Sequence, residues 1–191
     1  MKSISRLVGI AALAALPAMA QAQSSTTARP VSFGVSGGAS IPMGDLSDGV
    51  DVGYNIGAHV LLSPASMQML AFRGDVSLDS WKLKNNSKAS FRALDVMGNV
   101  ILKSSSAMAI KPYAIGGLGL VNSRASATST VVGGTTVTVE SQSKSNLGVQ
   151  VGGGLEFQLS GFTTFIEAKF VNAFTQDNST TWIPVTFGIR F

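Results

Sequence analysis

The last ten residues of the chain alternate in polarity, and this alternation constrains the fold more than any other feature. Ile183, Val185, Phe187, Ile189 and Phe191 are apolar, whereas the residues between them are small, polar or charged. Successive side chains of a β-strand point to opposite faces, so a period of two predicts a strand with one apolar face. Pro184 interrupts this pattern, and we expect a bulge or a missing ladder bond there.

The same alternation recurs along the chain and predicts eight strands in total. The earlier runs are 31–41, 52–62, 69–80, 91–102, one that starts near Ile110, one that ends near Leu159, and 164–172. Strands of about ten residues are long enough to cross a bilayer when tilted. Short connections alternate with longer ones at 42–51, 81–90, 123–145 and 173–181. This order predicts an antiparallel up-and-down barrel with short turns at one end and long loops at the other.

Composition indicates which face of these strands is inside. A soluble, lipocalin-like barrel would turn the apolar face inward, and its other face would meet water. That other face consists mainly of Gly, Ser, Asn and Gln, and only 13% of all residues are charged, whereas a solvent-exposed surface normally carries about 25–35%. The sequence therefore favours apolar side chains facing lipid and polar ones filling a narrow interior. Aromatic residues near the strand ends are expected at the membrane interfaces: Phe33, Tyr54, Phe157, Trp182 and Phe191.

The N-terminus has the pattern of a secretory signal. Lys2 and Arg6 precede an apolar run from Leu7 to Leu16, and small residues around Ala20 and Ala22 fit a cleavage site. We therefore expect a signal peptide over residues 1–22 and one barrel domain over residues 23–191. The chain has no cysteine, so the sequence implies no disulfide framework.

The terminal Phe191, preceded by Ile189 and Phe187, resembles the last strand of Gram-negative outer-membrane β-barrel proteins. With its eight strands, the chain resembles the small OmpX- and OmpA-type barrels. The resemblance implies an all-β, eight-stranded antiparallel up-and-down transmembrane β-barrel in the outer membrane, with both termini in the periplasm. It implies contact with outer-membrane lipid, a monomer, and recognition of Phe191, Ile189 and Phe187 by the barrel assembly machinery. No basic cluster suggests nucleic acid, and no metal or cofactor is implied.

Charged residues on the polar face are balanced in sign. They are Arg73, Asp75, Asp95, Lys111, Glu156, Glu167, Lys169 and Arg190. Isolated charges inside a small barrel are costly, so these side chains are expected to pair. One interpretation is a salt-bridged plug that fixes strand register, and the other is a gated or selective pore. OmpA-type barrels, which this chain resembles, have such an interior network.

His59 is the only histidine, and it tests whether the chain is an enzyme. Some eight-stranded barrels modify lipid A with a His, a Ser and an acidic residue, and Asp79-Ser80 superficially fits that set. The strand directions, however, place His59 on the order of 20 Å from Ser80 at ~3.3 Å per residue. We therefore expect no enzyme.

The third long connection is predicted to form a hairpin. Runs 128–132 and 135–139 are rich in β-branched residues, and Gly133-Gly134 between them fits a two-residue primed turn. If this turn sets the register, Leu118 lies opposite Val149 and Lys111 lies opposite Glu156, where the two would form a charge pair. A mobile Ser/Thr-rich loop is the alternative.

These features favour a structural or surface-interaction protein over other functions. The edge of the hairpin could accept a strand from an extracellular protein partner. A narrow channel for small solutes is the alternative function, and a lipid-modifying outer-membrane enzyme is the least favoured.

Overall fold

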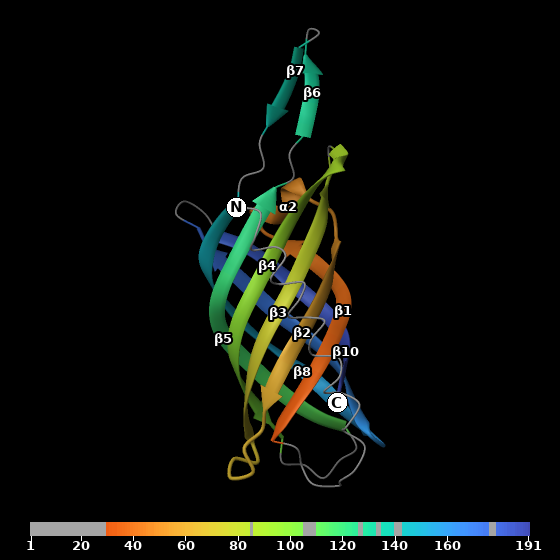
Figure 1. Cartoon of the computed structure of the whole chain (residues 1–191), viewed down its shortest axis with the longest axis vertical. Coiled ribbons are helices and arrows are strands. Elements are labelled where there is room, and N and C mark those ends of the chain that lie inside the picture. The colour runs from red at the N-terminus through yellow and green to blue at the C-terminus, as the bar shows by residue number, and fades with distance from the viewer. Residues whose placement is uncertain are drawn as a thin grey trace, which may run out of the picture.

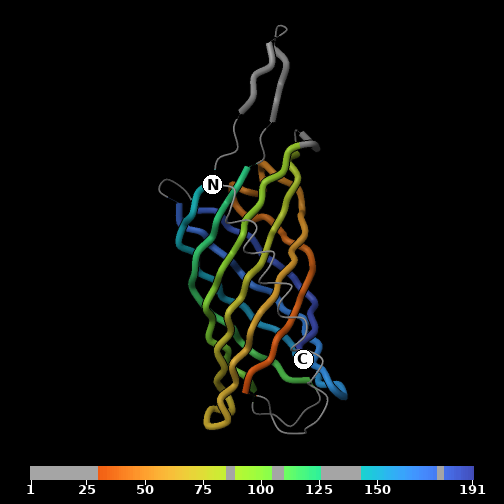
Figure 2. Tube along the Cα trace, in the orientation of Figure 1, coloured from red at the N-terminus to blue at the C-terminus, as the bar shows by residue number. Residues whose placement is uncertain are grey.

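The chain folds into a tall closed barrel (Figure 1 and Figure 2). A small separate two-stranded hairpin lies at one end of it (Figure 1). The structure, a computed structural model, describes residues 30–84, 86–104, 110–125, 128–132, 135–139, 143–175 and 179–191, without the side chains of 86–88, 128–132 and 135–139. The expected signal peptide and the predicted turn residues Gly133 and Gly134 lie outside these residues. No helix in the described part of the chain has the length and apolarity to span a membrane.

Eight long strands form the barrel wall, which confirms the predicted fold class. The strand order around the wall is β1-β10-β9-β8-β5-β4-β3-β2, and every neighbouring pair is antiparallel. The elements are β1 (Val31–Met43), α2 (Asp45–Gly49), β2 (Gly53–Leu62), β3 (Leu70–Leu83), β4 (Asn86–Lys103), β5 (Ile110–Ala125), β6 (Thr128–Val132), β7 (Thr135–Val139), β8 (Ser143–Leu159), β9 (Phe162–Phe174) and β10 (Ser179–Arg190).

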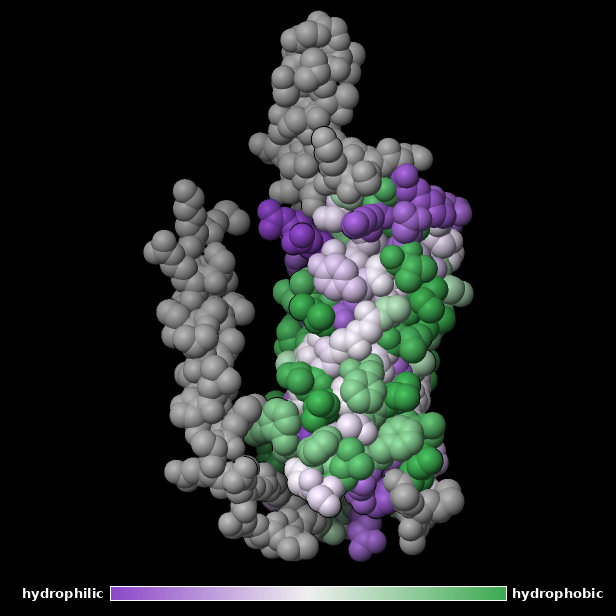
Figure 3. Space-filling view, turned by 90° about the vertical axis from the view of Figure 1, so that its right-hand side faces the viewer, coloured by the Kyte–Doolittle hydropathy of each residue, from purple (hydrophilic) through white to green (hydrophobic). Residues whose placement is uncertain are grey.

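The apolar rows of the strands face outward, and the polar rows face the interior. Leu118 and Val151 are 64% and 61% exposed, whereas Glu167 is 2% exposed. On β5, Leu118 and Leu120 are exposed while Tyr113 and Ile115 are buried. Figure 3 shows hydrophobic side chains over much of the barrel wall and hydrophilic ones gathered towards its upper end. An isolated barrel with this exposed apolar surface requires lipid around it.

The connection predicted as a loop at 81–90 is instead mostly strand. β3 and β4 remain paired through Trp81↔Phe91 and Lys82↔Ser90, and the register shifts only between Lys82 and Leu83. Trp81 is buried because the strand continues and turns its side chain into the barrel. The polar residues around it, which indicated a loop, lie on a ladder that extends to the barrel rim.

Pro184 interrupts one ladder without shifting the register. On the β9 side, pairing runs through Trp182↔Val171 and resumes at Val185↔Ala168 with the same offset. On the β1 side, Ser40 pairs with Pro184 in an unbroken series. Of the two expected outcomes, the structure therefore shows missing pairing and no bulge, since proline has no N–H to donate to one neighbour.

The predicted hairpin register is confirmed. Thr128 pairs with Val139 in the separate two-stranded sheet, and Leu118 pairs with Val149 in the barrel wall. Both pairs have the offset expected from a two-residue turn. The hairpin lies beyond the end of the barrel opposite to the C-terminus (Figure 1).

Candidate functional site: the interior of the barrel

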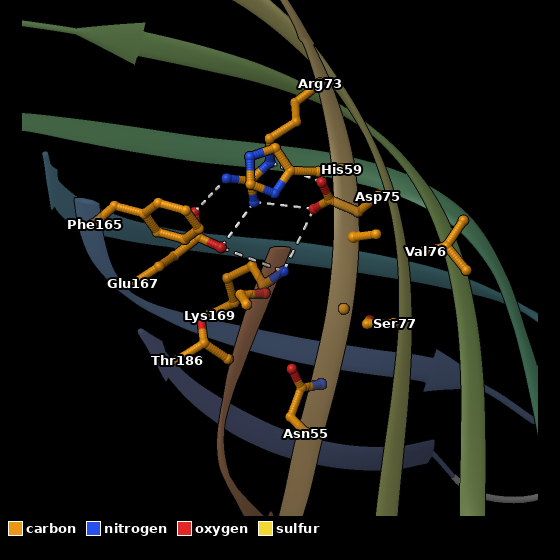
Figure 4. A pocket seen from close by; sticks show the side chains of 13 residues that line it. Asn55, His59, Arg73, Asp75, Val76, Ser77, Phe165, Glu167, Lys169 and Thr186 are labelled. Atoms are coloured by element: carbon orange, nitrogen blue, oxygen red, sulfur yellow. Dashed lines mark hydrogen bonds and ion pairs between the residues drawn. The ribbon is translucent and has the colours of Figure 1, made fainter. Parts of the chain in front are cut away.

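Arg73 is the centre of a charged network in the middle of the barrel. Its two terminal nitrogens donate to both carboxylate oxygens of Glu167 at 2.7 and 2.8 Å, and its Nε lies 2.8 Å from Asp75 Oδ1. Tyr113 Oη donates to Glu167 Oε2 at 2.7 Å. Lys169 Nζ lies 3.5 Å from Asp75 and 3.4 Å from Glu167. Figure 4 shows Arg73 and Asp75 of β3 and Glu167 and Lys169 of β9 pointing toward one another, so the network links two strands that are not neighbours in the wall.

Two amides extend this network across the barrel. Asn99 Nδ2 donates to Asp75 Oδ2 at 3.1 Å, and Gln150 Nε2 donates to Asn99 Oδ1. Asn99 lies on β4 and Gln150 on β8, so the chain of hydrogen bonds links strands that are not neighbours in the wall. Networks of this kind fix side-chain positions when every member is satisfied.

A second ion cluster lies toward the C-terminal end of the barrel. Arg190 Nη1 donates to Glu156 Oε1 at 2.8 Å, and Lys103 Nζ lies 3.8 Å from the same oxygen. Lys111 is the backbone partner of Glu156, but the two form no ion pair, so the predicted charge pair is wrong. Backbone register placed them opposite each other, but Arg190 and Lys103 reach the Glu156 carboxylate from other strands.

Asp79 and Asp95 form an acidic layer towards the opposite end. Asp79 is fully buried, and its neighbours include Ser40, Asn55 and Asp95. Ser77 Oγ donates to Asp95 at 3.3 Å. Among the described side chains, no cation lies within ion-pair distance of either carboxyl group. This layer therefore differs from the Arg73 network, where each carboxylate is paired.

Two tryptophans close the interior above the acidic layer. Trp81 and Trp182 meet edge to face with ring centroids 5.7 Å apart, and Trp81 Nε1 donates to the Ser40 carbonyl at 3.1 Å. They pack in one buried cluster with Val50, Ala93, Met97, Val121, Val171 and Ala173. Trp182 is 0% exposed, so its expected position at the membrane interface is wrong. Trp182 lies on the inward row of β10. The alternation of this strand indicates this position, because its odd-numbered residues are the ones that face outward.

His59 packs inside the barrel and does not meet Ser80. Its ring lies 5.3 Å from that of Phe165 in an edge-on contact, beside a small cavity with room for about one water molecule. His59 pairs with Asp75 on β3, whereas Ser80 pairs with Tyr54. Ser80 belongs to the outward row of β3, so a His–Ser pair does not form.

Of the eight predicted interior charges, the structure buries all except Lys111, which is half-buried. Sequence reasoning omitted Asp79 and Lys103 from this set. The alternation contained the signal for both, because Asp79 is two residues from Ser77 on the inward row of β3 and Lys103 is four from Asn99 on that of β4. Lys103 lies just beyond the predicted run 91–102 and was assigned to a turn, whereas Asp79 lies at the end of the run 69–80 and was considered only beside Ser80.

Comparison with known proteins identifies the same architecture. The model of a family described as outer membrane protein beta-barrel domain matches residues 8–191. Neisserial surface protein A has a TM-score of 0.60 and 15% identity, covering 85% of this chain and 96% of its own. A major outer membrane protein from Thermus thermophilus has a TM-score of 0.58 and 12% identity, covering 85% and 99%. These likenesses establish the fold, and no curated protein sequence matches the chain.

Proposed function

Because the chain belongs to the family of outer membrane protein β-barrel domains, we propose that it is a closed barrel with a structural or surface-interaction role in the outer membrane. The observation that carries this proposal is the filled interior. The two ion clusters, the acidic layer and the tryptophan cluster follow one another along the barrel axis. Such a barrel presents its loops and hairpin to the outside without providing a path for solutes.

A narrow channel would need a continuous polar passage. The cavity beside His59 has room for about one water molecule, and the buried tryptophan cluster lies on its hairpin side. Opening a path would require breaking the bidentate Arg73–Glu167 contact or displacing Trp81 and Trp182. Both changes carry a large energetic cost, since a buried ion pair and a packed aromatic cluster would be lost.

Conductance of the purified barrel in planar lipid bilayers tests this proposal. The wild-type protein is expected to give no steady conductance. The double variant Trp81→Ala/Trp182→Ala serves as a comparison, because it removes the aromatic closure while leaving the ion clusters in place. A large steady conductance of the wild-type barrel would favour the channel instead.

We also propose that the hairpin end is extracellular and that both ends of the mature chain face the periplasm. The C-terminal Phe191 lies at the end of the barrel opposite to β6 and β7 (Figure 1). The chain has no cysteine, so single cysteines report topology cleanly. Asp48→Cys at the hairpin end should react with a membrane-impermeant maleimide in intact cells. Ala65→Cys in the β2–β3 turn should react only after the outer membrane is permeabilised, and the reverse pattern would invert the orientation.

Phe191 is proposed to act in assembly as well as in closure. Its backbone exchanges two hydrogen bonds of 2.9 Å with that of Phe33, and these bonds pair β1 with the C-terminal residue. Phe191→Ser keeps these backbone bonds and removes the aromatic side chain. We expect this variant to fold normally into lipid vesicles but to accumulate poorly in the outer membrane of cells. Equal amounts of folded variant and wild-type barrel in cells would argue against an assembly role.

We propose no enzymatic activity. His59 contacts Phe165, and Ser80 lies on the other face of the barrel wall. Expression of the protein should therefore leave the acylation of lipid A unchanged when the lipid is examined by mass spectrometry. A change in acylation that His59→Ala abolishes would overturn this.

A further inference from the structure

The interior clusters differ in net charge along the barrel axis. The acidic layer holds two carboxyl groups and, among the described side chains, no cation within ion-pair distance of them. The Arg73 network in the middle holds two cations and two carboxylates. At the C-terminal end, three cations of the inward rows surround the single carboxylate of Glu156: Lys103, Lys111 and Arg190. This end of the interior therefore has an excess of positive charge.

The strand register brings Lys111 to this cluster without giving it a partner. Lys111 on β5 is the ladder partner of Glu156 on β8. Lys103 on β4 is the ladder partner of Tyr113, so the two lysines are diagonal on the same inward face. Diagonal positions are about 7–8 Å apart, within reach of long side chains. The Glu156 carboxylate is already bound by Arg190 at 2.8 Å and Lys103 at 3.8 Å, and Lys111 has no acidic partner among the described side chains.

No acidic residue in the connections at this end supplies the missing charge. These connections consist of residues 63–69, 104–109 and 160–161, and their sequences contain neither aspartate nor glutamate. The C-terminal carboxylate of Phe191 forms no ion pair with a lysine or arginine in the described part of the chain. Like charges so close together repel, so an anion bound between them would stabilise the folded barrel.

The cations lie at the mouth of the barrel, beyond an apolar floor. The floor is a buried cluster of inward side chains: Leu61, Ala71, Ile101, Tyr113 and Ile115. Lys103 is the next inward residue after Ile101 on β4, and its side chain is 18% exposed. Long basic side chains cover apolar surface with their stems and keep the charged end in water. A water-soluble anion can therefore reach the cations from the C-terminal side without passing deeper into the barrel.

Charge and position indicate which anion fits. Three cations against one carboxylate leave two positive charges in excess, which matches a phosphate group with its charge of about −1.5 to −2 at pH 7. A guanidinium group has five N–H donors, and Arg190 donates to Glu156 through Nη1. Arginine and lysine both bind phosphate oxygens well. The three cations belong to inward rows, whereas a lipid would lie against the outward rows, so the phosphate belongs to a water-soluble molecule.

We propose that Lys103, Lys111 and Arg190 form a binding site for the phosphate group of a water-soluble molecule at the C-terminal mouth of the barrel. Access to the site from the periplasm rests on the proposed orientation of the barrel, whereas binding itself does not depend on it. Bound phosphate neutralises the excess charge and stabilises the closed barrel at this end.

Solution NMR of the folded barrel in a neutral detergent tests the site with inorganic phosphate as the probe. The amide signals of Lys111, Tyr113 and Glu156 should shift in a saturable way when chloride holds the ionic strength constant. Lys103→Gln/Lys111→Gln should weaken binding by about tenfold, and Lys111→Arg should keep it within about twofold. Lys82→Gln is the matched control, because it removes an exposed cation near the opposite end of β3 and should leave these shifts unchanged.

A variant of Glu156 should act in the opposite direction. Glu156→Gln keeps an oxygen that can accept a hydrogen bond from Arg190, but it removes the negative charge that competes with phosphate. This variant should bind phosphate about fivefold more tightly. Weaker binding by a folded Glu156→Gln barrel would contradict the site.

Three further results would overturn it. These are no saturable shift at the three amides, the same shifts with chloride alone, and shifts caused by phosphatidylglycerol in the micelle but not by inorganic phosphate, which would indicate a lipid site. Heat-modifiable gel migration shows separately whether each variant is folded. A wild-type barrel with a steady conductance contradicts the proposed function, whereas a closed barrel that does not bind phosphate contradicts only this site.

Discussion

The two faces of the barrel wall hold charge in opposite ways, although the same strands build both. On the inward face, Arg73, Glu167 and Asp75 lie buried within ion-pair distance of one another. On the outward face, the rows between the rims have no described charge, and three cations lie near the hairpin-side rim: Lys82, Arg92 and Arg124. The difference shows that a charge is accepted inside when a partner reaches it from another strand, and outside only where water or headgroups are near.

The free energy needed to desolvate a charge explains this contrast between the two faces. A charge facing the acyl chains has no partner and must be desolvated, whereas an interior charge can exchange water for several hydrogen bonds. Glu167, for example, accepts hydrogen bonds from Arg73 and Tyr113 and lies near Lys169. The contrast leads to four predictions, which urea unfolding of the barrel in lipid vesicles can measure.

The largest effect is expected inside the barrel, at Glu167. Glu167→Ala leaves Arg73 without its bidentate partner and should destabilise the barrel by ~3–5 kcal/mol. The double variant Arg73→Met/Glu167→Met should recover most of this loss, because it leaves the Asp75–Lys169 pair matched and fills the space with apolar groups. If the double variant is as unstable as the single one, the pairing explanation fails.

A new charge on the outward face should reduce the stability of the barrel somewhat less than Glu167→Ala does. Val151 lies in the middle of the outward row of β8 and is 61% exposed, so Val151→Arg should destabilise the barrel by ~2–4 kcal/mol. Ser145→Arg lies on the same row near the rim and should cost no more than ~1 kcal/mol. A neutral Val151→Arg would mean that this row does not face lipid.

A smaller effect distinguishes the faces by space instead of charge. A Cβ at Gly154, on the inward face, would lie 2.5 Å from Tyr113 Oη, whereas one at Gly98, on the outward face, would lie 3.9 Å from the nearest atom, the Leu118 carbonyl oxygen. Gly154→Ala should therefore cost ~1–3 kcal/mol through overpacking. Gly98→Ala should stay within ~0.5 kcal/mol. Equal losses for the two alanines would show that interior packing is not what limits Gly154.

The smallest effect is expected at Asp95, which has no ion pair among the described side chains. Asp95→Asn keeps the shape of the side chain and can still accept a hydrogen bond from Ser77 Oγ, so stability should change by no more than ~1 kcal/mol. Glu167→Gln is the matched control, because it neutralises a carboxylate that is paired. A loss at Asp95 as large as that at Glu167 would show that the acidic layer needs its charge.

Much of the wall could be predicted from local pattern. The period of two assigned outward rows such as that of Val149 correctly, and the predicted hairpin register placed Leu118 of β5 opposite Val149. Errors arose where polar residues suggested a loop although the strand continued, as it does around Trp81. They also came where a residue type suggested an environment, as when Trp182 was assigned to the interface although its place in the alternation turns it inward.

The sequence alone determined the strands, their lipid-facing rows and the set of side chains that enter the interior, because each follows from the two-residue period of an extended chain and from composition. The partners inside were decided only by the tertiary structure. Glu156 is opposite Lys111 in the ladder yet binds Arg190 and Lys103, since closure of a tilted barrel brings side chains of several strands to the same level. The register of one strand pair does not specify which side chains meet across the interior. Those contacts are set only when β1 pairs with β10 and the barrel closes.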